Sequence, residues 1–438
     1  MLLRQFVDDD LGCASYLIGD EAAGEAVLVD PVYAIEPMLA EAERSGLRIT
    51  HVLETHTHAD HVSGHGRLAL DHGVPVAVHR AAGAAYPHDP LEEGDEIAVG
   101  SVTVRTLHTP GHRPEHCCFL AGDALMTGDS LFVGAAARPD LAVEAREGAE
   151  GLFYSLHRLL ELPDDIRVMP GHVAGSLCGA HMSAERSSTI GHERRFNAAL
   201  ALATVEGFVD DAASIAVPRP PNMEHIVELN RGPFVGAPRP VGPTERNGHF
   251  LLDVRDADRF AAGHAHGAVN VPVSGSAFGT KAGFLVPPGA TIVLQADVPA
   301  QAEAAAARLH AVGFFDIAGY LEEPDVGETL EPIGVDELKL LLGEGSVELI
   351  DVREPYERDD GYIPGSSNIP YRVIGSFAAD LPRDKTIVTI CETGPRAAIA
   401  ASVLASRGVP ARPVLHGGVD DWVSNGGDVC RFRRCGSS

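Results

Sequence analysis

The sequence predicts an α/β protein that is divided into about three domains. The chain has 438 residues, and a domain takes roughly 150 residues. In the first half, short β-branched runs alternate with helical patterns, which predicts packed sheets flanked by helices. After a proline-rich stretch, one unit of about 95 residues occurs twice, and repetition at that period indicates two copies of one fold.

Composition and charge exclude several classes of partner. Apolar residues make up 45% of the chain and charged residues 22%, which is enough to bury several cores. The net charge of −28 repels phosphate backbones, so we expect no nucleic-acid partner. No apolar run reaches roughly 18 residues, so we expect no membrane contact. The seven cysteines are scattered and the first residues lack a signal-peptide pattern, which favours reduced thiols in the cytoplasm.

The elements of the first half follow from hydrophobic pattern and turn residues. Two strand-like runs joined by glycine-containing turns predict a hairpin. A helix that ends at Gly46 follows, and then a buried strand leads into a polar cluster. In chain order we expect a hairpin, a helix, the buried strand, three further strands and a second helix, over 14–29, 34–45, 49–54, 74–78, 97–99, 102–107 and 152–160.

Ligand-type side chains gather where predicted strands end. The polar cluster after the buried strand holds three histidines and one aspartate within six residues, and three later segments add further ligands. Neutral imidazole and carboxylate suit zinc or iron(II). Four strand ends can converge at one edge of a sheet stack, so we expect a metal site from His56, His58, Asp60, His61, His112, Asp129 and His172.

This ordered set resembles the metallo-β-lactamase superfamily over roughly the first 230 residues. The resemblance implies an αββα sandwich with the metal site at one edge, and two branches of the superfamily act on thiol conjugates. Persulfide dioxygenases place one Fe²⁺ on residues that match His56, His112 and Asp129, with the other four in an outer shell. Hydroxyacylglutathione hydrolases use all seven residues for two Zn²⁺ ions bridged by Asp129, and a metal-bound hydroxide attacks the thioester.

Local sequence favours the dioxygenase branch. The segment 127–132, followed by Arg138-Pro139-Asp140, resembles segments of that family, and Arg138 could clamp the carboxylate of a thiol carrier. The alternative is a surface arginine. Residues 173–179 lack the Asp-Tyr of glutathione-using members, which leaves the thiol carrier open. We interpret Cys117, Cys118 and Cys178 as buried small hydrophobes.

The second half repeats itself after a linker at 232–248. Three segments recur in order: Leu252–Arg255 as Ile350–Arg353, Gly267–Pro272 as Gly365–Pro370, and Thr291–Val293 as Thr386–Val388. Each copy alternates apolar strands with helices, which predicts a parallel sheet covered on both faces.

The second copy carries Cys391-Glu392-Thr393-Gly394-Pro395-Arg396 between a predicted strand and a helix. This loop resembles that of rhodanese (sulfurtransferase) domains. The resemblance implies that Cys391 carries sulfane sulfur as a persulfide and that Arg396 holds the loop and an anionic substrate. The helix N-terminus favours the thiolate, whereas the charge of Glu392 opposes it. In the first copy, counting back 95 residues places Ala296 opposite Cys391 and Gln301 opposite Arg396, so that copy cannot form a persulfide.

We therefore expect a metallo-β-lactamase-like dioxygenase domain at 1–232, a cysteine-less rhodanese-like domain at 233–328, an active rhodanese domain at 329–428 and a basic tail at 429–438. We expect this tail to be frayed; the alternative is that it folds back on the body. The architecture resembles persulfide dioxygenase–sulfurtransferase fusions. It implies oxidation of a low-molecular-weight thiol persulfide by O₂ to sulfite and thiol, with one Fe²⁺ per chain, and exchange of sulfur between sulfite and thiosulfate at Cys391. Such chemistry fits a role in sulfide detoxification. We also expect the protein to form a homo-oligomer.

Two other functions remain open from the sequence. One is a two-zinc thioester hydrolase with a sulfurtransferase appendage. The other is a non-catalytic sulfur relay in which only Cys391 acts. Metal identity and count separate the first from a dioxygenase, and oxygen uptake with a persulfide separates the second.

Overall fold

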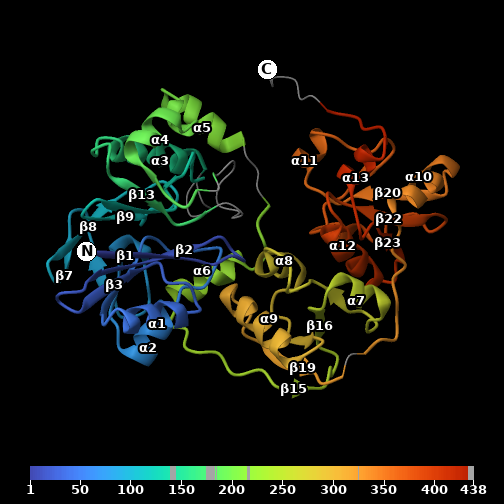
Figure 1. The fold of residues 1–438 in the computed structure, drawn as a ribbon, viewed down its shortest axis with the longest axis horizontal. Coiled ribbons are helices and arrows are strands. Elements are labelled where there is room, and N and C mark those ends of the chain that lie inside the picture. The colour runs from blue at the N-terminus through green and yellow to red at the C-terminus, as the bar shows by residue number, and fades with distance from the viewer. Residues whose placement is uncertain (139–144, 174–182, 184, 215–217, 324, 433–438) are drawn as a thin grey trace. The chain divides into compact units, whose positions relative to one another are not determined.

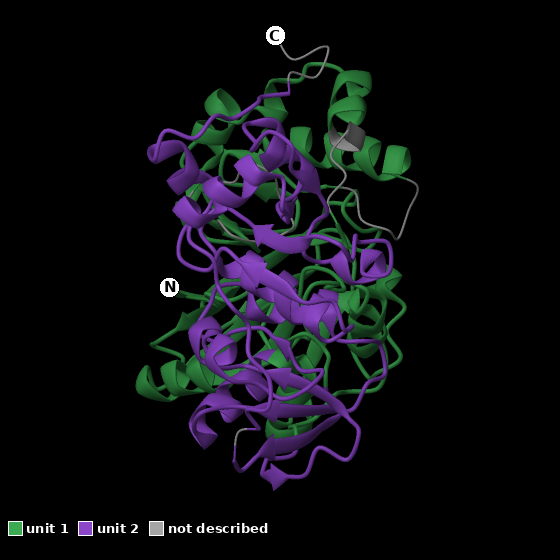
Figure 2. Cartoon of the chain, turned by 90° about the vertical axis from the view of Figure 1, so that its right-hand side faces the viewer, with its two compact units in different colours: residues 1–238, 309–314 green, residues 239–308, 315–438 purple. Residues whose placement is uncertain are grey.

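The computed structural model describes residues 1–138, 145–173, 183, 185–214, 218–323 and 325–432 (Figure 1). The chain forms two compact units, shown in different colours in Figure 2. The first unit comprises 1–238 with 309–314, and the second comprises 239–308 with 315–438. No helix within the described ranges is both long and apolar enough to cross a membrane.

The first unit is built on two six-stranded sheets. One sheet has the spatial order β1 (Leu2–Val7), β2 (Ala14–Asp20), β3 (Glu25–Val29), β4 (Arg48–Glu54), β5 (Val76–His79) and β6 (Asp89–Leu91). The other has the order β14 (Ser188–Thr189), β13 (Arg167–Pro170), β10 (Ala124–Gly128), β9 (Cys117–Ala121), β8 (Val102–His108) and β7 (Glu96–Val99). The helices are α1 (Glu36–Arg44), α2 (His65–His72), α3 (Ala145–Leu159), α4 (Ile190–Phe196), α5 (Val205–Ser214) and α6 (Met223–Arg231).

Three apolar layers hold this unit together. The facing sides of the two sheets share one core, in which Tyr16 and Val27 from the first sheet join Phe119 of the second. A second core lies between the first sheet and α1 and α2, and a third between the second sheet and α3 and α5. This order of layers confirms the predicted αββα sandwich. Cys117 and Cys118 are fully buried, as interpreted, whereas Cys178 lies outside the described residues.

Strand direction brings the polar segments to one edge of the stack. β3 and β4 are parallel, with a register shift between Ala26 and Val27, and β10 and β13 are parallel in the other sheet. The carboxyl ends of parallel strands meet at the same edge. The residues that follow β3, β4, β10 and β13 are therefore neighbours, although they are far apart in the sequence.

The second unit holds two all-parallel sheets, as the repeat predicts. The first sheet has the order β15 (Pro243–Thr244), β19 (Ile317–Leu321), β18 (Ile292–Gln295), β16 (Phe250–Asp253) and β17 (Val269–Asn270). The second has the order β21 (Ser367–Asn368), β20 (Val347–Asp351), β22 (Thr386–Ile390) and β23 (Ala411–Pro413). Helices around them include α7 (Ala257–Ala262), α8 (Phe278–Leu285), α9 (Pro299–Ala311), α10 (Val335–Glu344), α11 (Pro355–Asp359), α12 (Pro395–Ala405) and α13 (Val419–Ser424).

The chain beyond α13 is docked and not frayed as far as Phe432. Cys430 and Tyr362 exchange two backbone hydrogen bonds of 2.8 and 2.9 Å, and the Phe432 amide donates to the Asp359 carbonyl. The expectation of a frayed tail is therefore wrong for 430–432, because these backbone groups find partners in the loop after α11. Residues 433–438 lie outside the described part of the chain.

Candidate metal centre

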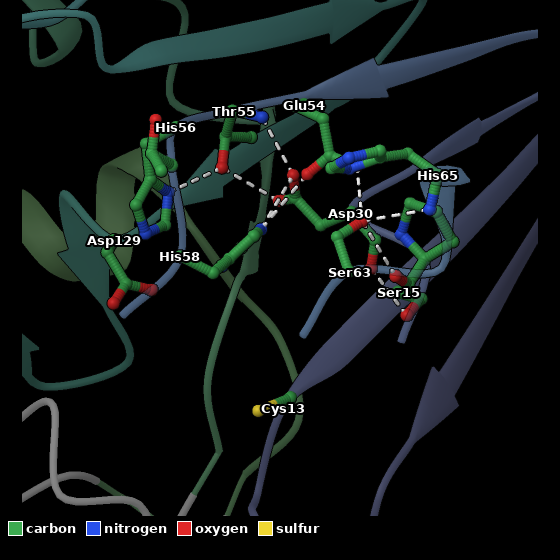
Figure 3. Close-up of polar contacts among 12 residues, drawn as sticks. Cys13, Ser15, Asp30, Glu54, Thr55, His56, His58, Ser63, His65 and Asp129 are labelled. Carbon is green, nitrogen blue, oxygen red and sulfur yellow. Dashed lines mark hydrogen bonds and ion pairs between the residues drawn. The ribbon is translucent and has the colours of Figure 1, made fainter. Parts of the chain in front are cut away.

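The edge of the sandwich gathers three groups of ligand-type side chains. His56, His112 and Asp129 form one group, in which the nearest ligand atoms all lie within 4.8 Å of one another. Cys13, Asp60 and His61 form a second, and Asp30, Glu54 and His58 form a third. The seven residues predicted from the sequence are thus all at this edge, but they do not form a single ligand set. Figure 3 shows members of the three groups.

The ligands of the first group are oriented by hydrogen bonds on their far sides. The Thr55 hydroxyl donates to Asp30 at 2.8 Å, so it accepts from Nδ1 of His56 at 2.9 Å. Nδ1 of His112 donates to the Arg138 carbonyl at 2.8 Å. Both contacts leave Nε2 as the free lone pair, which is the atom that a metal needs. Burial, with the neighbouring histidines, holds the pKa of His56 well below its usual value and keeps the ring neutral.

Asp129 is the anionic member of the group. It follows β10, is buried, and accepts a 2.7 Å hydrogen bond from Nδ1 of His172. Burial alone would raise the pKa of Asp129, but His172 and His112 outweigh it and lower that pKa below its usual range. His172 also reaches Asp60 at 2.8 Å through Nε2. Both ring nitrogens of His172 therefore lie against carboxylates.

His58 turns away from the first group. Its Nε2 lies 3.3 Å from both Asp30 and Glu54, which are themselves buried. Burial alone would lower the pKa of His58, but the two carboxylates outweigh it and raise that pKa well above its usual value. The same carboxylate of Glu54 accepts from Ser63 at 2.6 Å. His58 thus faces two carboxylates that belong to a polar network (Figure 3).

The second group contains Cys13, which was not among the ligands predicted from the sequence. Sγ of Cys13 lies 3.2 Å from Asp60 and 3.3 Å from each of His61 and His172. Burial raises the pKa of the Cys13 thiol. Asp30 directly follows β3, so the rule that found the histidines after strand ends applies to it. Cys13 precedes β2, which is antiparallel to β3 and therefore begins at the same edge.

A residue with no sequence signal fastens the metal-binding loop. Asn230, in α6, accepts from the Ser63 amide at 2.8 Å and donates to the carbonyls of His58 and His61 at 2.9 and 2.7 Å. An amide side chain in a distant helix cannot be assigned to this loop from spacing.

The three residues of the first group fit a metal ion. Two imidazoles with free Nε2 atoms and one ionised carboxylate form a donor set that suits iron(II) or zinc. The donor set alone does not separate the two metals, because both accept nitrogen and oxygen ligands.

A separate candidate site lies in the second unit around Cys391. The thiol is buried between β22 and α12, and Sγ accepts from the Gly394 amide at 3.1 Å. Gly394 has φ of 106°, and a Cβ there would lie 1.9 Å from the Leu415 carbonyl, so only glycine fits. Arg396 pairs with Glu357 through two contacts of 2.7 Å.

The charge of Glu392, which seemed to oppose a thiolate, has a local partner. Oε2 of Glu392 lies 3.0 Å from Nη1 of Arg353. Arg353 is buried, and its other nitrogens hold Asp351. The pair compensates the negative charge beside Cys391.

The first copy has a shorter loop at the equivalent position. Register pairs Asp253 with Gln295 and Asp351 with Ile390, so Ala296 does correspond to Cys391. Three residues separate β18 from α9, whereas four separate β22 from α12. Aligning the helix starts places Ala300 opposite Arg396, and not Gln301, because counting at a constant offset ignores the missing residue.

Comparison with known proteins agrees with this architecture. The metallo-beta-lactamase superfamily matches residues 8–172. The human mitochondrial persulfide dioxygenase ETHE1 is 33% identical over 237 residues, which cover 52% of this chain and 87% of the relative. The chain belongs to the metallo-β-lactamase superfamily. Rhodanese-like domains match 242–323 and 334–425, so this superfamily member is a fusion with two rhodanese-like domains.

Two further relatives match different lengths of this chain. A crystal structure of a metallo-beta-lactamase from Staphylococcus aureus is 32% identical, with a TM-score of 0.68, and the match covers 73% of this chain and 98% of that one. A hydroxyacylglutathione hydrolase from Rhodopseudomonas palustris is 35% identical over 162 residues, which cover 36% of this chain and 61% of the relative. The match to the human dioxygenase therefore extends further along both chains than the match to the hydrolase.

Proposed function

We propose that this fusion oxidises low-molecular-weight thiol persulfides at one Fe²⁺ ion and transfers sulfane sulfur at Cys391. The observation that carries the proposal is the separation of His56, His112 and Asp129 from His58. A two-zinc site would take His58 as a ligand to the first metal. Here Nε2 of His58 faces two buried carboxylates at 3.3 Å and belongs to a different group of ligand atoms from His56, His112 and Asp129.

Iron(II) held by His56, His112 and Asp129 would supply electrons for O₂ and open coordination positions for the persulfide. The chain's own residues prepare that site. Asp30, acting through Thr55, fixes the His56 ring, and His172 keeps Asp129 ionised through a 2.7 Å hydrogen bond. We propose that Arg138, whose carbonyl already orients His112, binds a carboxylate of the thiol carrier with its side chain.

Asp60, His61 and His172 form the outer shell in this proposal. Burial alone would raise the pKa of Asp60, but His61 and His172 outweigh it and lower that pKa. The ionised Asp60 anchors His172, and His172 anchors Asp129. Substitution in this chain of contacts would loosen the carboxylate ligand without removing it.

The second activity is sulfur transfer between sulfite and thiosulfate. The Cys391 thiolate attacks the terminal sulfur of a persulfide, the sulfur–sulfur bond of the donor breaks, and the carrier leaves as a thiolate that takes up a proton. Sulfite then removes the sulfane sulfur as thiosulfate and restores the Cys391 thiolate. We propose that Arg396 braces the loop through Glu357. Linking the two domains would raise the concentration of sulfite near Cys391.

Metal analysis of anaerobically purified protein tests the proposal. We expect about one iron per chain and oxygen uptake with a thiol persulfide. His58→Ala should retain the iron, whereas His112→Ala should lose it. Two zincs per chain, or loss of the metal in both variants, would contradict the dioxygenase.

The alternative is a two-zinc thioester hydrolase. The similarity to a hydroxyacylglutathione hydrolase and the nearby group of Cys13, Asp60 and His61 favour it. Hydrolysis of an acyl-thiol without oxygen uptake would establish that alternative. A homo-oligomeric state, a cytoplasmic location and the domain limits 1–232, 233–328 and 329–428 remain predictions.

A further inference from the structure

A cavity of about 600 Å³ lies beside the Cys391 loop, within the last rhodanese-like domain. That volume is in the range of small-molecule sites, roughly 300–1,000 Å³. The loop contributes Glu392, the residue next to Cys391. The other walls come from the segment around α11, from α13 and from the docked tail, which places Arg431 at the cavity. Four separate segments thus build the cavity.

The charges that line the cavity fall into two classes. Glu392 is paired with Arg353 at 3.0 Å, and Glu357 is paired with Arg396 at 2.7 Å. Within the described chain, no ion pair engages the other lining charges, Asp360, Asp420 and Arg431, and all three are exposed. The cavity therefore offers a ligand one cation and two carboxylates.

We propose that this cavity binds the carrier end of an amino-acid-type thiol persulfide, a thiol that bears both an ammonium and a carboxylate group. The inference rests on the proposed sulfur transfer at Cys391. Arg431 would take the ligand carboxylate as a charge-assisted pair, and Asp360 and Asp420 would take the ammonium. Thiosulfate and sulfite carry no ammonium group, so they leave both carboxylates unused. An anionic carrier without an amine would meet two repelling charges and one attracting charge.

Glu392 lines the cavity and adjoins the buried Cys391, so a carrier bound in the cavity would hold its sulfur beside that residue. The thiolate forms a bond to the terminal sulfur, and the donor's own sulfur–sulfur bond breaks. The electron pair of that bond leaves with the carrier thiolate, which takes a proton from water. One persulfide is consumed and one is formed, so the step needs no oxidant or reductant.

Three persulfide donors test the proposal on the full-length chain. Cysteine persulfide carries both charged groups, 3-mercaptopropionate persulfide carries only the carboxylate, and cysteamine persulfide carries only the ammonium. Transfer to sulfite is measured as thiosulfate under argon, where oxygen is absent. Asp420→Asn should raise KM for the two ammonium donors roughly two- to five-fold relative to 3-mercaptopropionate, the size of an exposed ion pair. Arg431→Gln should raise KM for the two carboxylate donors by a similar factor relative to cysteamine.

Matched controls lie in the same domain, at a different cavity that residues of the first copy also line. Arg383→Gln and Asp384→Asn remove the same charges at residues that line that cavity, and they should leave the ranking of the three donors unchanged. Equal changes for all three donors in the Asp420 and Arg431 variants, or no change in either, would overturn the proposal. Transfer that persists in Cys391→Ser would instead overturn the proposed sulfurtransferase. Binding of cysteine itself then tests the cavity, and binding that Asp420→Asn and Arg431→Gln leave unchanged would overturn the cavity proposal.

Discussion

The two rhodanese-like copies share their scaffold almost bond for bond. Nε of Arg255 donates to Asp253 at 3.0 Å and Nη2 donates to the Gly263 carbonyl at 2.8 Å. In the second copy, Arg353 makes the same contacts to Asp351 and the Gly361 carbonyl at 3.0 and 2.7 Å. The repeated asparagine donates to two carbonyls at 2.9 Å in both copies, as Asn270 and as Asn368.

The copies differ where the chemistry would occur. The loop after β22 has four residues and wraps the Gly394 amide onto Cys391, whereas the loop after β18 has three residues and carries Ala296. Both copies therefore keep the buried arginine–aspartate pair after the equivalent strand, and they differ in loop length and in one thiol. The first copy is thus a scaffold that retains its packing without its nucleophile.

The largest expected effect comes from removing the thiol of the second copy. Cys391→Ser should lower thiosulfate formation by more than about 1,000-fold, because the nucleophile carries the transferred sulfur. Oxygen uptake with a persulfide should stay unchanged. Coupled assays of thiosulfate and oxygen measure both. Loss of oxygen uptake as well would show that the two activities share a group.

A second variant tests whether the missing thiol alone accounts for the lack of sulfur transfer expected of the first copy. Ala296→Cys, placed in the Cys391→Ser background, should restore no measurable transfer, because the shorter loop lacks the residue that brings a backbone amide onto the sulfur. Thiosulfate formation and mass spectrometry of the persulfide report the result. Recovery of activity would mean that loop length does not matter.

The shared scaffold can be tested by cutting the same pair in each copy. Arg255→Ala and Arg353→Ala should each destabilise the protein by about 3–5 kcal/mol, because each removes the hydrogen-bonded partner of a buried aspartate. After the second change, Asp351 keeps Arg358 at 3.8 Å. Denaturant unfolding measures the loss. Arg353→Ala should also slow sulfur transfer, since Glu392 loses its 3.0 Å partner, whereas Arg255→Ala should not. Equal slowing in both variants would indicate a general folding defect.

The smallest effect is expected at the brace of the active loop. Glu357→Gln should weaken the pair with Arg396 by about 0.5–1 kcal/mol, because both groups are partly solvated, and should slow transfer two- to five-fold. Steady-state kinetics with a persulfide and sulfite measure it. Glu337→Gln, which removes an exposed partner of Arg412, serves as the control and should leave transfer unchanged.

The sequence pattern by itself predicted packed sheets flanked by helices, the parallel sheets of the two repeats and the strand ends that carry histidine and aspartate, whereas the αββα order of layers came from the family resemblance. These features follow from local pattern, since hydrophobic period and turn residues act over a few neighbours. The position of Cys391 at a helix start follows from the same local information. The aligned position of Ala296 also follows, but the loop shortened by one residue does not, because a repeat count assumes a constant offset.

Only the tertiary structure decided how those ligand-type residues divide. His56 and His58 are two residues apart, yet one faces Asp129 and the other faces Asp30 and Glu54, because each ring turns to whichever group its packed neighbours supply. The contacts of Asn230 and the position of Arg431 at the cavity have the same origin. Their partners lie far away in the chain, and side-chain distance is fixed by how layers and loops pack, which sequence spacing does not encode.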